Sequence, residues 1–124
     1  MVINFNPKYI PGDIVYNHKK EIIRITSSYL KGTKLFYYRD GDYGWIREDA
    51  IAPIPLTPEI LKKNGWKKLY EKFFEKNVND IRLTIELSEN IYVAINRIFI
   101  MEIHYIHELQ HLLFGLGIKH EMEV

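Results

Sequence analysis

The sequence predicts an α+β fold in which a bent amino-terminal antiparallel sheet is followed by a short helix and a β-hairpin packed by a carboxy-terminal amphipathic helix. Three observations predict it. Between residues 9 and 54, turn residues separate short runs rich in β-branched and aromatic side chains. Helix-start and helix-stop signals flank residues 58–64. Two runs of alternating polarity, 81–87 and 91–95, then precede a helical pattern at 103–114.

The amino-terminal part, residues 1–56, is expected to be a β subdomain. Its strands are predicted at 14–16, 21–26, 34–38 and 43–46. The turn Asp40-Gly41-Asp42 suits a hairpin, because Asp and Gly tolerate the positive φ of tight turns. Short strands at this spacing are typical of a small, strongly bent SH3-like sheet.

Residues 57–124 are expected to form a second subdomain that packs with the first as one compact domain. Thr57 is placed to cap a helix that has Pro58 in its first turn and stops at Asn64-Gly65. Residues 66–76 are ambiguous, because their aromatic residues fit a helical stripe and also favour strands; we expect a helix there. The last helix is expected to end at Gly115 or Gly117.

Composition excludes several classes of protein. The chain has 124 residues, no cysteine and a formal net charge of +1. The lack of cysteine excludes a disulfide scaffold and a thiol nucleophile, and the near-neutral charge argues against a polybasic nucleic-acid binder. No apolar run reaches the roughly 18 residues of a membrane span, and the first residues lack the pattern of a signal peptide. A cytoplasmic protein with no membrane partner is expected.

Residues 107–111 read His-Glu-Leu-Gln-His, the H-E-x-x-H pattern of zinc metalloproteases. On a helix, His107 and His111 lie one turn apart on one face, where they can bind Zn²⁺ while Glu108 activates a water molecule. The apolar stripe opposite, Tyr105, Ile106, Leu109, Leu112, Leu113 and Leu116, is expected to dock on the sheet and leave the motif in solvent. Gly117 stands where the extended motif has its third His. We therefore expect no catalytic residue, metal or cofactor, and a zinc-dependent hydrolase stays an alternative.

Aromatic and basic residues interleave between residues 16 and 47, a run that also contains Tyr29, Lys31 and Lys34. A second basic run lies between residues 62 and 76. The candidate binding residues are Tyr16, Lys19, Lys20, Arg24, Tyr37, Tyr38, Arg39, Tyr43, Trp45, Arg47, Lys62, Lys63, Lys67 and Lys68. Small barrels bind single-stranded nucleic acid with such residues, by stacking bases on aromatic rings beside a cationic groove. Tyr, Trp and Arg are also the anchors of protein interfaces, which need no excess of positive charge.

Two segments resemble a known group of proteins. Residues 53–61 read PIPLTPEIL, and residues 105–117 read YIHELQHLLFGLG. They resemble small phage and mobile-element proteins of Bacteroidota that have no assigned activity and that combine a PIPLTxExL segment with a YxHxLQxLxF end. The likeness covers residues 51–124 well and the amino-terminal sheet loosely. It implies that His107, Leu109 and Gln110 belong to the structural framework, and the group has Asn where this chain has His111.

A phage setting implies an inhibitor of host defence, such as an anti-CRISPR protein directed at a type VI-B system. The expected function is accordingly a non-catalytic binding protein that forms a stoichiometric complex with a host defence protein or an RNA-guided effector, with RNA contact as a further expectation. The alternatives are a single-stranded nucleic-acid-binding small barrel and the zinc-dependent hydrolase. The oligomeric state is left open.

Overall fold

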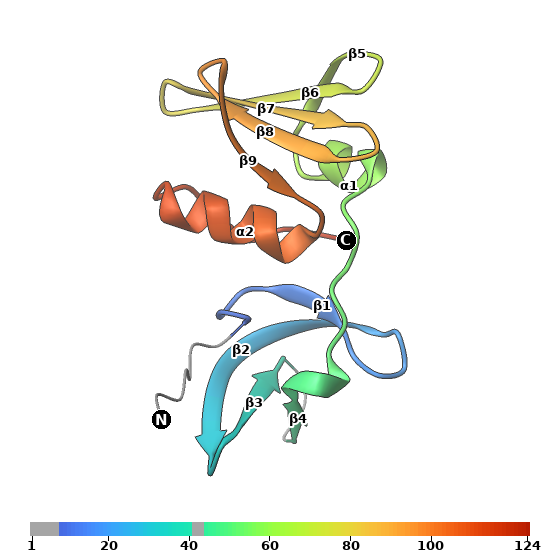
Figure 1. Cartoon of the computed structure of the whole chain (residues 1–124), viewed down its shortest axis with the longest axis vertical. Helices are drawn as coiled ribbons and strands as arrows, with labels where there is room; N and C mark the ends of the chain where they lie inside the picture. The colour runs from blue at the N-terminus through green and yellow to red at the C-terminus, as the bar shows by residue number, and fades with distance from the viewer. Residues whose placement is uncertain (1–7, 41–43) are drawn as a thin grey trace. The chain divides into compact units, whose positions relative to one another are not determined.

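The computed structural model describes residues 8–40 and 44–124, and the chain divides into an amino-terminal unit, residues 1–54, and a carboxy-terminal unit, residues 55–124 (Figure 1). Each unit contains one antiparallel sheet with strands in sequential order. The described residues therefore form a mostly β version of the predicted α+β fold. No helix in these two ranges is long and apolar enough to cross a bilayer.

The amino-terminal unit is a curled four-stranded sheet (Figure 1). Its elements are β1 (Ile14–Tyr16), β2 (Ile22–Lys31), β3 (Lys34–Arg39), β4 (Trp45–Arg47) and the short 3₁₀ turn η1 (Glu48–Ala50). The predicted bent sheet is confirmed, and β2 continues beyond its predicted end at Thr26. A β-bulge between Ile25 and Ser27 bends β2, which lets the sheet curl. Of the predicted turn 40–42, only Asp40 lies within the described residues.

Tyr37 is at the centre of the amino-terminal core. The core side chains are Tyr9, Val15, Ile25, Tyr37, Ile46 and Ile51. The Tyr37 hydroxyl accepts hydrogen bonds from the main-chain N–H groups of Lys8 (3.0 Å) and Tyr9 (3.3 Å), and it donates one to the Glu48 carboxylate. The Tyr9 ring meets it edge to face, with 5.5 Å between ring centroids. One phenol therefore joins the segment before β1, strand β3 and the turn η1.

The Tyr37→Phe variant is expected to lower the free energy of unfolding of this unit by about 1–3 kcal/mol at neutral pH, because the Glu48 carboxylate and two N–H groups lose a partner. Burial, and then the hydrogen bond to Glu48, raise the pKa of Tyr37 well above its ordinary value of 10.0. The stability gained from this shift is therefore present below pH 10.0 and is lost as the pH rises above it. Urea unfolding followed by Trp45 fluorescence, in a Trp66→Phe background, measures the effect. The free energy of unfolding should fall more steeply with alkaline pH when Tyr37 is present than in Tyr37→Phe; equal slopes would contradict the assignment.

The carboxy-terminal unit is a five-stranded sheet with two helices (Figure 1). Its elements are α1 (Pro58–Lys63), β5 (Lys67–Tyr70), β6 (Phe73–Val78), β7 (Ile81–Leu87), β8 (Ile91–Ile95), β9 (Ile98–Ile103) and α2 (Ile106–Gly115). The predicted hairpin is confirmed as β7 and β8, and it forms the middle of a larger sheet. Helix α1 is also confirmed: the Thr57 hydroxyl accepts from the N–H of Ile60 at 3.3 Å, and Pro58 begins the helix.

Two predictions for this unit are wrong. Residues 66–76 form the hairpin of β5 and β6 rather than a helix, with Phe74 1% exposed in the core and Phe73 on the opposite face. The chain turns at Glu71, whose φ is 41°. Glu rarely adopts a positive φ, so its presence in the sequence does not indicate a turn. Strand β9 was not predicted, because its continuous apolar run lacks alternation, and α2 consequently begins at Ile106 rather than at residue 103.

The chain after α2 turns at Gly117, whose φ is 72°, and its last residues return to the end of α1. The Asn64 side chain donates to the Glu123 carbonyl and accepts from the Glu123 N–H, both at 2.8 Å. The Gln110 amide donates to the His120 carbonyl at 3.0 Å. Ile118 and Met122 are buried, so this tail is part of the folded unit.

Candidate binding face

The outward face of the amino-terminal sheet gathers aromatic and basic side chains from three strands. Tyr37 and Ile46 are cross-strand partners that both point into the core, so their neighbours along β3 and β4 point outward. Cross-strand partners share a face of a sheet, and the register aligns Tyr29 with Phe36 and Tyr38 with Trp45. We call the following set the aromatic–basic face: Tyr29, Lys31, Lys34, Phe36, Tyr38, Trp45 and Arg47.

Trp45 is the centre of this face. Its ring centroid lies 4.5 Å from that of Phe36, 4.9 Å from that of Tyr29 and 6.2 Å from that of the nearly parallel Tyr38 ring. The Lys31 ammonium lies 5.5 Å from the Trp45 ring centroid, a cation–π distance. Despite these contacts, Tyr29 is 46% exposed, Trp45 40% and Tyr38 37%. The rings therefore form a pre-arranged cluster that still offers a large apolar area to a partner.

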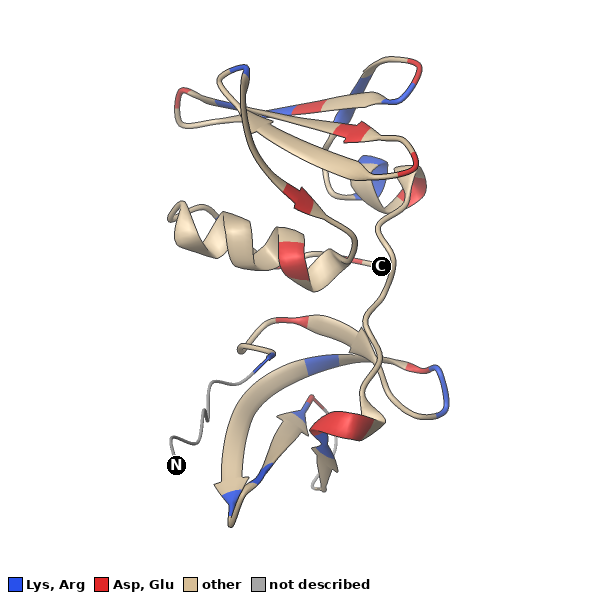
Figure 2. Cartoon of the chain, in the orientation of Figure 1, with Lys and Arg blue, Asp and Glu red and all other residues tan. Residues whose placement is uncertain are grey.

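The charge on this face is positive but partly neutralised. Lys31 and Lys34 are exposed where β2 turns into β3, a basic region that is visible in Figure 2. Arg47 pairs with Asp49 at 2.6 Å. A surface hollow of about 440 Å³ adjoins the face and contains both signs of charge; it is lined by Lys8, Lys34, Leu35, Arg47, Glu48, Asp49 and Ile51. This mixture favours a ligand that combines apolar and acidic groups over a pure polyanion.

The predicted binding residues of this unit do not all share the face. Tyr38, Trp45 and Arg47 lie on it, together with Tyr29, Lys31 and Lys34 of the same predicted run. The structure adds Phe36, which strand alternation around Tyr38 would have indicated. The prediction for Tyr37 is wrong, because the same alternation turns its side chain into the core, where it is 0% exposed. The others lie elsewhere: Tyr16 on β1, Lys19 and Lys20 in the turn after it, Arg24 on β2 beside Asp40, and half-buried Arg39 at the end of β3. Tyr43 lies outside the described residues.

The predicted lysine run does not form one helical face. Lys62 and Lys63 occupy the last turn of α1, whereas Lys67 and Lys68 lie on β5, the edge strand of the sheet. The Lys63 ammonium donates to the Val124 carbonyl at 2.9 Å. Lysines at the end of a helix complement its dipole, and lysines along a sheet edge discourage edge pairing. The role of these four lysines in binding stays a prediction.

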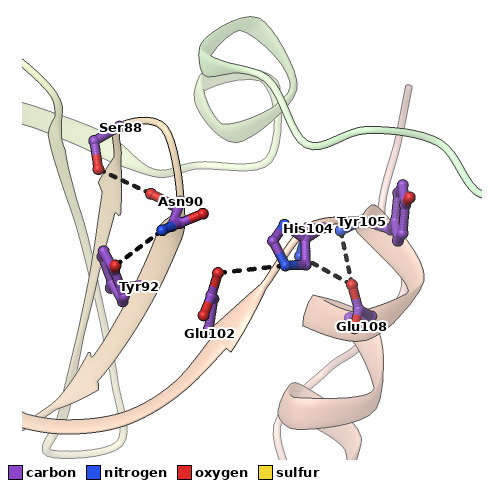
Figure 3. A network of polar contacts seen from close by, with 7 residues as sticks. All are labelled: Ser88, Asn90, Tyr92, Glu102, His104, Tyr105 and Glu108. Atoms are coloured by element: carbon purple, nitrogen blue, oxygen red, sulfur yellow. Dashed lines mark hydrogen bonds and ion pairs between the residues drawn. The ribbon is translucent and has the colours of Figure 1, made fainter.

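The H-E-x-x-H motif begins helix α2, and its acidic residue caps that helix. Figure 3 shows the Glu108 carboxylate turned back to the main chain, where its Oε1 accepts from the N–H groups of His104 (2.9 Å) and Tyr105 (3.0 Å). Glu102 pairs with the His104 ring at 3.4 Å in the same network. Glu108 thus satisfies free N–H groups at the helix start, a position in which it stabilises the helix.

The prediction that the motif faces solvent is wrong for His107, which is 4% exposed. The buried stripe of α2 consists of Ile106, His107, Leu109, Gln110 and Leu113, so the helix is rotated relative to the predicted apolar stripe. The His107 ring stacks on Tyr105, with 5.9 Å between centroids, and meets His111 edge to face at 5.5 Å. Within residues 8–40 and 44–124, no three His, Cys, Asp or Glu side chains gather closely enough to hold a metal ion. These contacts favour a structural role for the motif.

Comparison of the chain with protein-family models, with curated proteins and with solved structures finds no match.

Proposed function

We propose that this chain is a non-catalytic binding protein and that the aromatic–basic face is its contact surface. The observation that supports this most strongly is the cluster of partly exposed rings around Trp45. Trp, Tyr and Arg are the residues that most often dominate binding energy, and hot spots lie where such residues are closely packed. The curled sheet that carries them suits the SH3-like fold expected from the sequence, in which a rigid scaffold holds the rings in place before binding.

The proposed partner is a protein of a host defence system, or an RNA-guided effector, which the chain inhibits by forming a stoichiometric complex in the cytoplasm. The side-chain chemistry supports a protein surface, because the face combines apolar rings with few cations and Asp49 neutralises one of these. The class of partner is inferred from residues 53–61 and 105–117, because these segments resemble phage and mobile-element proteins.

A single-stranded nucleic acid is the second candidate. The observation in its favour is the position of Lys31 over the Trp45 ring, with Lys34 and Arg47 on the same face, because stacked bases and nearby phosphates need rings and cations side by side. The two candidates differ in salt dependence. Phosphate contacts make affinity fall steeply as salt rises, whereas an apolar protein interface is much less sensitive.

The deciding experiment mixes the purified chain with a purified type VI-B effector, with and without its guide RNA, and measures complex mass by light scattering after gel filtration. A stoichiometric complex that forms without RNA, persists at high salt and reduces target-RNA cleavage supports the proposal. Binding to free single-stranded RNA alone, with a steep salt dependence, would select the second candidate. Failure to bind either the effector or RNA would contradict both.

A further inference from the structure

The two edges of the carboxy-terminal sheet differ sharply. The edge strand β5 begins with Lys67 and Lys68, and lysines on an edge discourage pairing with another strand. The opposite edge, β9, carries Ile98, Phe99 and Ile100, which are 67%, 61% and 46% exposed. In the part of the chain that the structure describes, β9 pairs only with β8. Its outer side thus combines unpaired main-chain groups with a continuous apolar run.

A β-bulge determines which side chains of this edge share a face. The register joins Val93 to Met101 and Ala94 to Phe99, so Ile100 is an extra residue in β9. Phe99 and Glu102 consequently lie on the same face of the sheet, because Phe99 is opposite Ala94 and Glu102 is opposite Tyr92. The rings of Phe99 and Tyr92 are in contact, with 5.8 Å between centroids.

Arg97 lies in the turn just before β9, with a φ of 70°. It lines a hollow of about 300 Å³ together with Phe73, Thr84, Glu86, Tyr92, Val93, Ala94 and Phe99. On the opposite face of the sheet, Ile98 is aligned with Ile95, and Met101 with the buried Val93. The outer face therefore carries a positive charge at Arg97, in the turn just before β9, and a negative charge at Glu102, near the end of β9.

We propose that β9 is a self-association edge, on which the β9 strands of two copies pair antiparallel about a two-fold axis. In the register that centres Phe99 and Ile100 on the axis, Ile98 lies opposite Met101 of the second copy, and Arg97, in the turn just before β9, comes next to Glu102 of the second copy. Ile98 and Met101 share a face only because of the bulge; in an unbroken strand, residues 98 and 101 would point to opposite faces. A two-fold interface makes both contacts twice.

A second copy is the occupant that this edge fits best. An unpaired strand edge needs extended backbone as its partner. β9 itself is extended and apolar, with Arg97 just before it and Glu102 near its end. Pairing would cover the three exposed apolar side chains and join the two sheets. This inference is independent of the proposed function, because oligomeric state is measured without any partner.

Sedimentation velocity of the full chain over a wide concentration range tests it first. We expect a concentration-dependent monomer–dimer equilibrium in the wild type. Ile100→Lys should shift the chain to monomer, because it places a charge at the centre of the interface. Leu69→Lys is the matched control: it adds the same charge to a 39% exposed residue on the opposite edge, and should leave the dimer intact.

Charge reversal tests the register. Arg97→Glu and Glu102→Arg should each weaken self-association about tenfold, since each variant places like charges opposite one another at two symmetric points. An equimolar mixture of these two variants should restore the dimer, because each copy then offers the complementary charge. A wild type that is monomeric throughout, or a mixture that stays monomeric while the wild type dimerises, would overturn the proposal. Loss of the dimer in the control Leu69→Lys would also overturn the proposal.

Discussion

Trp45→Ala is expected to weaken binding of the partner by about 30-fold or more while the amino-terminal sheet stays folded. Trp45 contacts Tyr29, Phe36 and Tyr38, so its removal deletes the largest ring of the face and leaves the other three without their common support. Central interface residues of this type cost about 2 kcal/mol or more when truncated, which corresponds to that change in affinity. The side chain is 40% exposed and is not one of the core residues, so the fold should tolerate the change.

Titration calorimetry with the purified effector, or with RNA if that proves to be the ligand, measures this effect. Tyr70→Ala is the matched control, because Tyr70 is also an exposed aromatic residue, 61% exposed, that contacts a single neighbouring ring, Phe73, but lies on β5 of the other unit. We expect Tyr70→Ala to bind like the wild type. Equal losses in the two variants, or full affinity in Trp45→Ala, would show that the aromatic–basic face is not the contact surface. Circular dichroism of each variant checks that the sheets remain folded.

Met122→Ala is expected to lower the free energy of unfolding of the carboxy-terminal unit by about 2–5 kcal/mol. Met122 is 3% exposed although it is the third residue from the end of the chain, and truncating a buried side chain of this size leaves a cavity. Its neighbour Glu123 is bonded to Asn64 through both main-chain groups, so the chain cannot easily shift to fill the space. The last residues should therefore contribute as much to stability as an internal core position.

Trp66 provides the measurement, because it is 3% exposed and lines the same hollow as Met122. Urea unfolding followed by Trp66 fluorescence, in a Trp45→Phe background, reports on this unit alone. Glu121→Ala is the control, because Glu121 is the exposed neighbour of Met122. This variant should change the free energy of unfolding by less than about 0.5 kcal/mol. Unchanged stability in Met122→Ala would show that the tail is only loosely attached.

Local signals in the sequence predicted a large part of the fold. The cap Thr57 and the following Pro58 located α1, because capping depends on a few neighbouring residues. Strict alternation located β7 and β8, since each has one buried face. The strands β5, β6 and β9 were missed or misassigned. The turn between β5 and β6 uses Glu71 at a positive φ, a residue that does not indicate a turn, and the continuous apolar run of β9 lacks alternation.

For the candidate site too, the sequence predicted one part and only the structure supplied the rest. The sequence indicated that aromatic and basic residues between residues 16 and 47 carry binding, and three of the predicted residues, Tyr38, Trp45 and Arg47, lie on the aromatic–basic face. It could not separate Tyr38 from its neighbour Tyr37, because which face of β3 is buried depends on contacts with Tyr9 and Ile51, far away in the chain. In α2, the rotation that buries His107 likewise depends on what the helix packs against.

The sequence by itself determined the fold class, the positions of the amino-terminal strands, of β7, β8 and α1, and the side-chain types available for binding. These properties follow from interactions between residues close together in the chain. Only the tertiary structure decided that Tyr37 lies at the centre of the amino-terminal core, that Glu108 caps α2, and that Met122 is buried. Each of these three features depends on cross-strand register or on the packing of segments far apart in sequence. Whether a side chain is buried depends on those distant neighbours and not on the residues beside it in the chain.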